Sequence, residues 1–271
     1  MVSAAAPGPA AAAFPRLQQV WRYRELLRGL VVRNLKVKYQ RSLLGFVWTL
    51  VNPLLTVSIL VVVFSHVVRI QVPDYWAFLL SGYFVWNFML QTLNTGTWIF
   101  AEHSRLTRSV AFPSEILVFS AAGSRLIEFL AEISLILVAM ILLHHHAVPA
   151  SFALVPLLIV LQVVLAIGLA LPIATLSVFY YDIYHALPIA LTSLFYLSPV
   201  FYPASMVPES LRTLYFLNPI AGLLTLYHEV VYAGQWPSAG LLAGTCAATA
   251  LVWVFGYAIF HRYSASFAEI V

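Results

Sequence analysis

Three ionisable residues, Arg125, Glu128 and Glu132, stand within a long apolar stretch of the sequence. Their spacings of three, four and seven place the three side chains on one face of a helix. A charged side chain at the centre of a membrane helix costs roughly 2.5–3.5 kcal/mol on insertion scales unless it faces protein or water. The acids either pair with Arg125 as a structural cluster or line a polar pathway. The arginine in the same helix favours structural pairing.

The sequence offers little other chemistry. Side chains of the consecutive residues His144–His146 diverge, with no carboxylate nearby in sequence, so we expect no metal site. The single cysteine, Cys246, excludes an internal disulfide. Neither of the two lysines, Lys36 and Lys38, follows a glycine, and no GxxxxGK[ST] phosphate-binding loop, G-x-S-x-G elbow or H-E-x-x-H helix occurs. We therefore expect a non-catalytic chain that itself holds no cofactor.

The composition predicts an all-α integral membrane protein. Of 271 residues, 62% are hydrophobic and 9% are charged, whereas about a quarter of a soluble protein is charged. About 20 apolar residues suffice for one crossing of a bilayer. Six segments qualify as transmembrane helices: Val47–Val68, Trp76–Ala101, Ile116–Leu143, Phe152–Tyr180, Ala186–Phe201 and Gly240–Phe260.

The positions of Lys and Arg predict the orientation, because cytoplasmic loops are enriched in them. Eight of the 14 precede the first span, and six spans bring four more to the same side. Only Arg69 and Arg212 fall on the outer side, so we expect both termini in the cytoplasm. The twelve inner residues are Arg16, Arg22, Arg24, Arg28, Arg33, Lys36, Lys38, Arg41, Arg105, Arg108, Arg125 and Arg262.

The segment 21–45 is basic and amphipathic, and we expect it to form a helix on the cytoplasmic membrane surface. The competing interpretation is the charged flank of a first transmembrane helix. Residues 1–20 are expected to be a disordered tail, 46–262 the six-helix transmembrane domain and 263–271 a cytoplasmic tail. The apolar face of the amphipathic segment consists of Tyr23, Leu26, Leu27, Leu30, Val31 and Leu35.

Two further segments have features that a simple connector would not need. The inner loop 102–115 mixes charged with apolar residues, which predicts a short helix that docks onto another protein; an ordinary solvated connector is the alternative. After the fifth span, Pro199, Pro203, Pro208 and Pro219 interrupt any continuous helix. We expect short helices there that lie on the outer leaflet or enter it.

Three segments in this order resemble the permeases of bacterial ABC exporters for polysaccharides, of the kind that export O-antigen, capsule or teichoic acid. They read RELLRGLVVRNLKVKYQRSLLGFVWTLVNPLL, LTRSVAFPSEIL and LSPVFYPASMVPESLRTLYFLNP. The resemblance covers nearly all of the chain from Tyr23 to Tyr257. It implies a homodimer with two separate ATPase subunits that bind ATP and Mg. Relatives commonly carry Arg-Asp where this chain has Tyr181-Asp182, so a contact by that arginine is not assumed.

The resemblance also implies roles for individual residues. The amphipathic segment becomes an interface helix beside the ATPase, the segment after Ser198-Pro199 becomes re-entrant helices near the outer mouth, and the inner loop becomes a coupling helix. The ATPase-coupling residues are Arg105, Leu106, Thr107, Arg108, Val110, Phe112 and Pro113.

We expect the channel between the first and fifth spans of two copies. Aromatic rings there would pack on sugar rings, and basic residues at the inner entrance would attract the pyrophosphate of a lipid carrier. Bundle packing and simple membrane orientation, respectively, are the competing interpretations. An ABC exporter of another lipid or drug, or a proton-coupled transporter that uses Glu128 and Glu132, are the alternative functions. The candidates are Trp48, Phe64, Phe195, Tyr196, Phe201 and Tyr202 for the channel, and Arg33, Lys36, Lys38 and Arg41 for the entrance.

Overall fold

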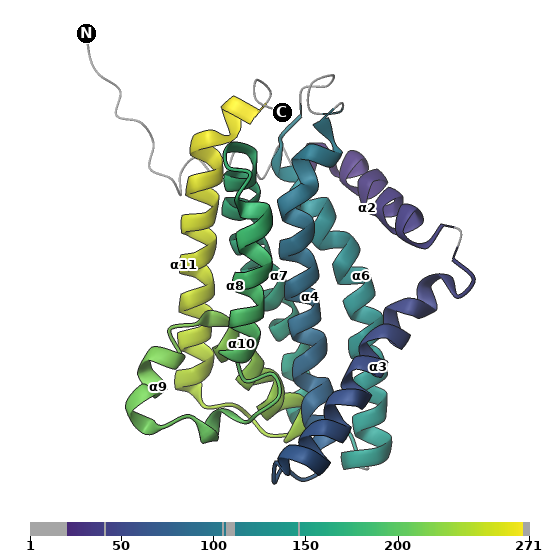
Figure 1. Cartoon of the computed structure of the whole chain (residues 1–271), viewed down its shortest axis with the longest axis vertical. Helices are drawn as coiled ribbons and strands as arrows, with labels where there is room; N and C mark the ends of the chain where they lie inside the picture. The colour runs from purple at the N-terminus through teal and green to yellow at the C-terminus, as the bar shows by residue number, and fades with distance from the viewer. Residues whose placement is uncertain (1–20, 41, 105, 107–111, 146, 268–271) are drawn as a thin grey trace.

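The computed structural model describes residues 21–40, 42–104, 106, 112–145 and 147–267. Within these ranges the chain forms helices and no strand, as the composition predicts. The long helices run side by side along the longest axis, and α2 crosses obliquely outside them at one end (Figure 1). The elements are α2 (Arg24–Tyr39), α3 (Trp48–Val62), α4 (Tyr75–Glu102), α6 (Glu115–Ala139), α7 (Val155–Phe179), α8 (Ile183–Tyr196), α9 (Glu209–Tyr215), α10 (Pro219–Tyr227) and α11 (Ala239–Tyr263).

Four helical stretches in the described part are long and apolar enough to cross a membrane: Gly45–Val68, Glu115–His145, Ala150–Phe179 and Ala239–Tyr263. They correspond to the first, third, fourth and sixth expected spans. The second expected span is α4, with 28 residues, and the fifth is α8, with only 14.

The predicted bounds of the fifth span were wrong. Its helix ends at Tyr196, five residues before the expected end at Phe201, and a turn follows through Ser198 and Pro199. Proline restricts the residue before it to extended conformations and cannot donate a backbone hydrogen bond. The chain therefore leaves the helix early.

Helix α4 is the central helix of the bundle. It packs against α3, α6, α7 and α8, and most of its residues are buried. Phe84, Val85 and Met89 are fully enclosed, and so are the polar side chains Ser81 and Thr92. Because protein surrounds α4, the helix can carry more polar residues than a helix that faces lipid.

Helices α7 and α11 pack closely through two glycines. A Cβ atom added to Gly256 would lie 1.9 Å from the backbone oxygen of Gly168, and one added to Gly168 would lie 3.0 Å from the Cα of Trp253. Small residues that let two backbones approach are typical of helix contacts in membranes. This contact holds the last helix of the described chain against the bundle.

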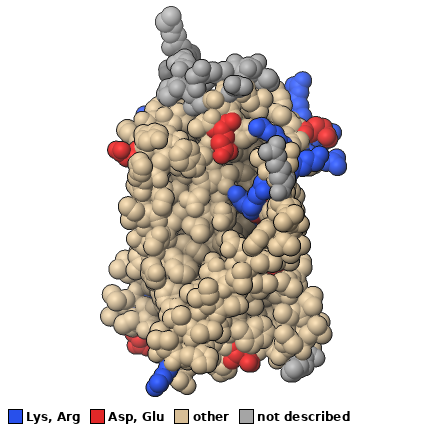
Figure 2. Space-filling model, turned by 45° about the vertical axis from the view of Figure 1, so that its right-hand side comes forward, with Lys and Arg blue, Asp and Glu red and all other residues tan. Residues whose placement is uncertain are grey.

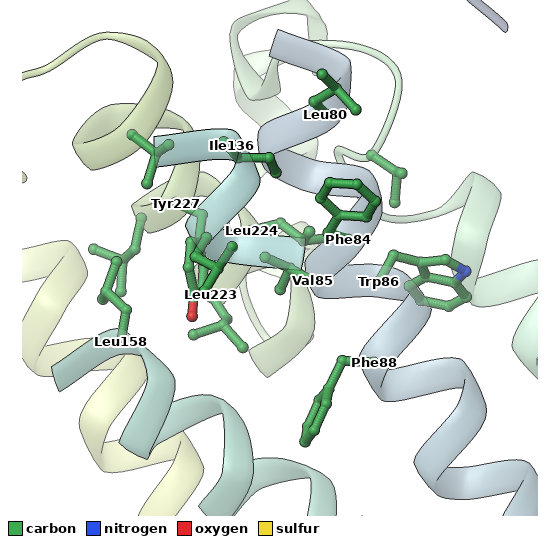
Figure 3. Close-up of a cluster of buried hydrophobic side chains, with 14 of the residues drawn as sticks. Leu80, Phe84, Val85, Trp86, Phe88, Ile136, Leu158, Leu223, Leu224 and Tyr227 are labelled. Atoms are coloured by element: carbon green, nitrogen blue, oxygen red, sulfur yellow. The ribbon is translucent and has the colours of Figure 1, made fainter. Parts of the chain in front are cut away.

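Short helices follow the break after α8, as the prolines predict. The Asn218 side chain accepts a hydrogen bond from the backbone N–H of Ile220 at 3.0 Å and so caps α10. The same side chain donates to Ser198 Oγ at 2.9 Å, which joins α10 to the turn after α8. Leu223, Leu224 and Tyr227 of α10 point into the core beside α4 (Figure 3).

Helix α2 has the two faces that the sequence predicts, although it is shorter than the predicted segment 21–45. Most of its apolar residues are buried or half-buried, with Leu30 5% exposed, whereas Arg24, Arg28 and Lys36 are exposed, as are the two apolar residues Val32 and Val37. It packs on α6. A Cβ atom on Gly123 of α6 would lie 3.0 Å from Cγ2 of Val31, so this glycine makes room for α2.

Candidate functional site

Four side chains from two helices meet around the carboxylate of Glu128, and we call them the Glu128 cluster: Lys38, Tyr39, Arg125 and Glu128. Lys38 Nζ donates to both carboxylate oxygens at 2.8 Å, and Arg125 Nη1 lies 3.0 Å from Oε2. The Tyr39 hydroxyl donates to Oε1 at 2.6 Å and also contacts Thr49 Oγ1. The cluster thus joins the last turn of α2 to α6, and through Thr49 to the first turn of α3.

The pairing of Arg125 with Glu128 confirms the structural interpretation for this acid. The sequence did not reveal Lys38 and Tyr39 as partners, because they lie 90 and 89 residues away from Glu128. Burial and the nearby Arg125 lower the pKa of Lys38 below its ordinary value, although Glu128 acts in the opposite direction. Burial and the bond to Glu128 raise the pKa of Tyr39, so its hydroxyl remains a donor.

Glu132 does not join this cluster. Its side chain is 2% exposed, and Asn87 Nδ2 of α4 donates to its Oε1 at 3.3 Å. Among the described residues no Lys or Arg forms an ion pair with it. The three ionisable residues therefore divide into a charge-paired group and a separate buried acid.

Two cavities flank the Glu128 cluster. The first, of about 570 Å³, lies between α2, α4 and α6, and Arg33, Glu102 and Arg125 line it. The second, of about 300 Å³, lies between α3, α4 and α6. Lys38 and Glu128 line both cavities, so their ion pair stands between the two spaces.

Of the four expected entrance residues, the structure brings two to the same cavity. Arg33 and Lys38 line the larger cavity, and Lys38 is bound to Glu128. Lys36 is exposed on α2, and Arg41 lies outside the described residues. The space-filling view shows Lys and Arg gathered at the end of the molecule that holds α2, above a broad uncharged band (Figure 2).

Five of the six expected channel aromatics form one cluster around Phe201. Its ring centroid lies 4.9 Å from that of Phe64, 5.5 Å from that of Phe195 and 5.0 Å from that of Tyr202. Tyr196 is 5.8 Å away and remains 59% exposed. The group links the end of the first span to the turn after α8. We call it the Phe201 cluster: Phe64, Phe195, Tyr196, Phe201 and Tyr202.

Hydrogen bonds hold the Phe201 cluster in place. The Tyr75 hydroxyl of α4 donates to the Phe201 carbonyl at 2.5 Å, and the Tyr215 hydroxyl of α9 donates to Tyr202 at 3.2 Å. Trp48, the sixth candidate, does not belong to this cluster. It stands at the start of α3 and lines the 300 Å³ cavity beside Lys38.

The structure describes three of the seven expected coupling residues: Leu106, Phe112 and Pro113. Leu106 and Phe112 pack against the buried core that α4, α6 and α7 share, and Pro113 precedes α6. These two apolar residues therefore contact the chain's own bundle, which by itself accounts for their presence. Arg105, Thr107, Arg108 and Val110 lie outside the described residues.

The histidine run has a partner that the sequence did not indicate. His144 Nδ1 lies 2.9 Å from Asp74 Oδ2, on the loop before α4, and His145 Nε2 lies 3.1 Å from the Val231 carbonyl. His146 is not among the described residues. In the part of the chain that the structure describes, no group of three His, Cys, Asp or Glu side chains is arranged to hold a metal ion.

The chain is similar in sequence to known proteins over most of its length. The model of the ABC-2 type transporter family matches residues 25–232. The O-antigen export system permease protein RfbA of Myxococcus xanthus is 30% identical over 258 residues, which are 94% of this chain and 98% of that protein. Two proteins of the same name from Klebsiella pneumoniae are 27% and 25% identical, each over 91% of this chain and 95% of their own length. This integral membrane protein therefore belongs to the ABC-2 type transporter family of membrane subunits.

Proposed function

We propose that two copies of this chain form the channel of an ATP-driven exporter that moves a lipid-linked polysaccharide across the bacterial cytoplasmic membrane. The cargo belongs to the O-antigen, capsule or teichoic acid class, and two separate ATPase subunits bind ATP and Mg. The observation that carries the proposal is the similarity, over nearly the full length, to permeases named for O-antigen export.

In this proposal each chain crosses the membrane six times, with both termini in the cytoplasm. Helices α4 and α8 supply the second and fifth crossings. The gathering of Lys and Arg at the α2 end supports this orientation, because positive residues are retained on the cytoplasmic side (Figure 2). Short helices α9 and α10 then lie near the outer mouth, as re-entrant elements beside the broken fifth span.

The Phe201 cluster suits a glycan path. Sugar rings present C–H faces that pack on aromatic rings, and tyrosine hydroxyls can bond to sugar hydroxyls. Tyr196 keeps an exposed face. The cluster lies where the first and fifth spans meet, which is where the proposed channel of the dimer runs.

The cytoplasmic end supplies the entrance and the contact with the motor. Arg33 and Lys38 line a cavity of about 570 Å³ beneath α2, where positive charge favours the phosphate groups of a lipid carrier. Lys36 and Arg41 complete the proposed entrance. The segment from Arg105 to Pro113 is the proposed coupling helix, seated in a cleft of the ATPase.

Two observations favour ATP-driven export over proton coupling. The chain belongs to the ABC-2 type transporter family. Glu128 is bonded to Lys38, Tyr39 and Arg125, so its charge is already balanced within the protein. A carboxylate held in this way has a structural role that needs no proton transfer.

Deletion of the gene in the source bacterium tests both the transport and the cargo. We expect the deletion strain to retain a lipid-linked glycan inside the cell, and mass spectrometry of that material identifies the sugar. The wild-type chain should restore export only when its ATPase partner can bind ATP, so an ATPase variant with its phosphate-binding lysine replaced is the control. Retention of a lipid without sugar, or of a drug, would contradict the polysaccharide assignment.

A further inference from the structure

The 300 Å³ cavity lies between α3, α4 and α6, with Lys38 and Tyr39 of α2 also in its lining, and we call it the α3–α4–α6 chamber. Tyr83, Asn87 and Gln91 stand on successive turns of α4, and Asn52 and Thr56 stand one turn apart on α3. Residues four apart share one face of a helix, so each helix turns a polar row toward the same space. The full lining is Lys38, Tyr39, Trp48, Thr49, Asn52, Pro53, Thr56, Tyr83, Asn87, Gln91, Glu128 and Glu132.

The chamber holds more hydrogen-bonding groups than the described residues use. Glu132 is 2% exposed, and its one hydrogen bond comes from Asn87. The side-chain amides of Gln91 and Asn52 form none with the described residues, although both line the chamber. A polar group that loses contact with water without gaining a hydrogen-bond partner costs free energy. The chamber is therefore suited to an occupant that can both donate and accept several hydrogen bonds.

The charge of the lining argues against an anionic occupant. The two cations near the chamber, Lys38 and Arg125, are both paired with Glu128, so no unpaired Lys or Arg of the described residues faces the chamber. Lys38 is held by Glu128 at 2.8 Å. A phosphate group would find no free cation there and would lie close to the acids, whereas neutral hydroxyl groups can donate to the carboxyl groups and bond to the amides.

We propose that the α3–α4–α6 chamber binds a neutral sugar headgroup of a membrane lipid. Sugar hydroxyls match the amide, hydroxyl and carboxylate groups of the wall, and the ring of Trp48, 45% exposed, offers a surface for the C–H face of a pyranose. A volume of about 300 Å³ lies at the lower end of the range for small-molecule sites, about 300–1,000 Å³.

This site is distinct from the proposed channel. It lies within one protomer, whereas the Phe201 cluster is the expected channel lining, and Trp48 is the one channel candidate that the structure assigns to the chamber instead. The choice of a sugar as ligand rests on the proposed function. The chamber would then hold the first sugar of the cargo, or a glycolipid that accompanies transport.

The binding experiment uses the full chain in nanodiscs of phosphatidylethanolamine and phosphatidylglycerol. The probe is a dodecyl glucoside that carries a diazirine on its sugar, and mass spectrometry locates the labelled peptides. We expect labels on the chamber-lining parts of α3, α4 and α6. Excess unlabelled dodecyl glucoside should remove them, and dodecyl phosphocholine should not.

Variants test the chamber itself. Gln91→Leu removes a side-chain amide, and Glu132→Gln replaces an acceptor oxygen of the carboxyl group by an NH2 donor; we expect each to weaken labelling about fivefold. Thr56→Phe fills the chamber without removing a charge and should abolish labelling. Ser58→Phe is the matched control, because Ser58 is exposed on α3 and its hydroxyl, like that of Thr56, donates to the carbonyl four residues before it. Thermal unfolding of each variant shows that it remains folded.

Equal labelling of the wild-type chain and the folded Thr56→Phe variant would overturn the proposal, and so would equal competition by dodecyl phosphocholine. Both outcomes concern the purified chain and say nothing about glycan export in cells, so they do not disprove the proposed function. A deletion strain that retains no glycan would disprove the proposed function, while labelling of the purified chain would still report on the chamber.

Discussion

At the scale of single residues, Glu128 is the point on which α2, α3 and α6 converge. One carboxylate accepts hydrogen bonds from Lys38, Tyr39 and Arg125, and two of these residues belong to the surface helix α2. The ion pair is buried on the Glu128 side, where the side chain is 8% exposed, and more open at Lys38, which is 40% exposed. The cost of removing a charge from water therefore falls mainly on Glu128.

Replacement of Glu128 should destabilise the chain more than replacement of Lys38. Glu128→Leu leaves Arg125 buried without a partner carboxylate, which costs about 3–5 kcal/mol. Lys38→Met leaves the Arg125–Glu128 pair intact and removes a partly exposed charge, so we expect a cost of about 1 kcal/mol or less. Thermal unfolding of the purified chain in detergent measures both. An equal or larger loss for Lys38→Met would show that Arg125 does not hold Glu128.

At the scale of elements, the proposed function assigns the contact with the ATPase to α2 and the inner loop. The structure places α2 on α6, with Arg24, Arg28 and Lys36 exposed, and packs Leu106 and Phe112 of the loop against the bundle core. The apolar residues of the loop thus anchor it. Recognition of the ATPase would then depend on the charged residues Arg105 and Arg108.

The double variant Arg105→Ala, Arg108→Ala should uncouple transport from ATP hydrolysis. Removal of both guanidinium groups weakens the proposed contact with the ATPase, whereas the anchoring by Leu106 and Phe112 remains. We expect glycan export to fall while the assembled complex still hydrolyses ATP. The control is Arg262→Ala, at the end of α11. Normal export by the double variant would mean that the loop is only a connector.

The close contact between α7 and α11 leads to a second prediction for these elements. Gly256→Ala would place a methyl group 1.9 Å from a backbone oxygen of α7, so the two helices must separate. Gly244→Ala on the same helix meets no atom within 4 Å and should stabilise the chain by about 0.5–1 kcal/mol through helix propensity. Thermal unfolding and size-exclusion chromatography in detergent compare the two. Tolerance of Gly256→Ala would contradict the observed packing.

At the scale of the whole molecule, the described chain keeps exposed apolar faces on the helices that should line the channel. Ile59 on α3 is 65% exposed and Ile189 on α8 is 70% exposed. In a membrane such a face contacts either lipid or a second protein. The proposed homodimer covers these two faces with each other.

Cysteine crosslinking tests this arrangement, because Cys246 is the only native cysteine. In a Cys246→Ala background, Ile59→Cys combined with Ile189→Cys should yield a covalent dimer in native membranes with a short bifunctional reagent. Phe255→Cys on α11 is the control, since Phe255 is 66% exposed and lies on a helix outside the proposed channel. Dimers of the control alone would place the interface at α11 instead.

Much of the architecture was predictable from local sequence patterns. The period of apolar residues on α2 correctly separated its buried from its exposed face, and the prolines after α8 correctly predicted short helices. The bounds of the fifth span were less predictable, because apolar composition continues past Tyr196 while the backbone leaves the helix at Ser198-Pro199. A hydropathy profile measures how apolar a segment is, and it does not distinguish a helix from an apolar turn.

The sequence by itself determined the membrane class and the helical content, and it favoured the pairing of Arg125 with Glu128, because these depend on composition and on spacing within one helix. Only the tertiary structure brought Lys38 and Tyr39 to Glu128, Asp74 to His144 and Trp48 into the polar chamber. Each of these contacts joins residues of different helices or loops. Local periodicity sets which face of a helix is polar, and the packing of the helices decides which polar faces meet.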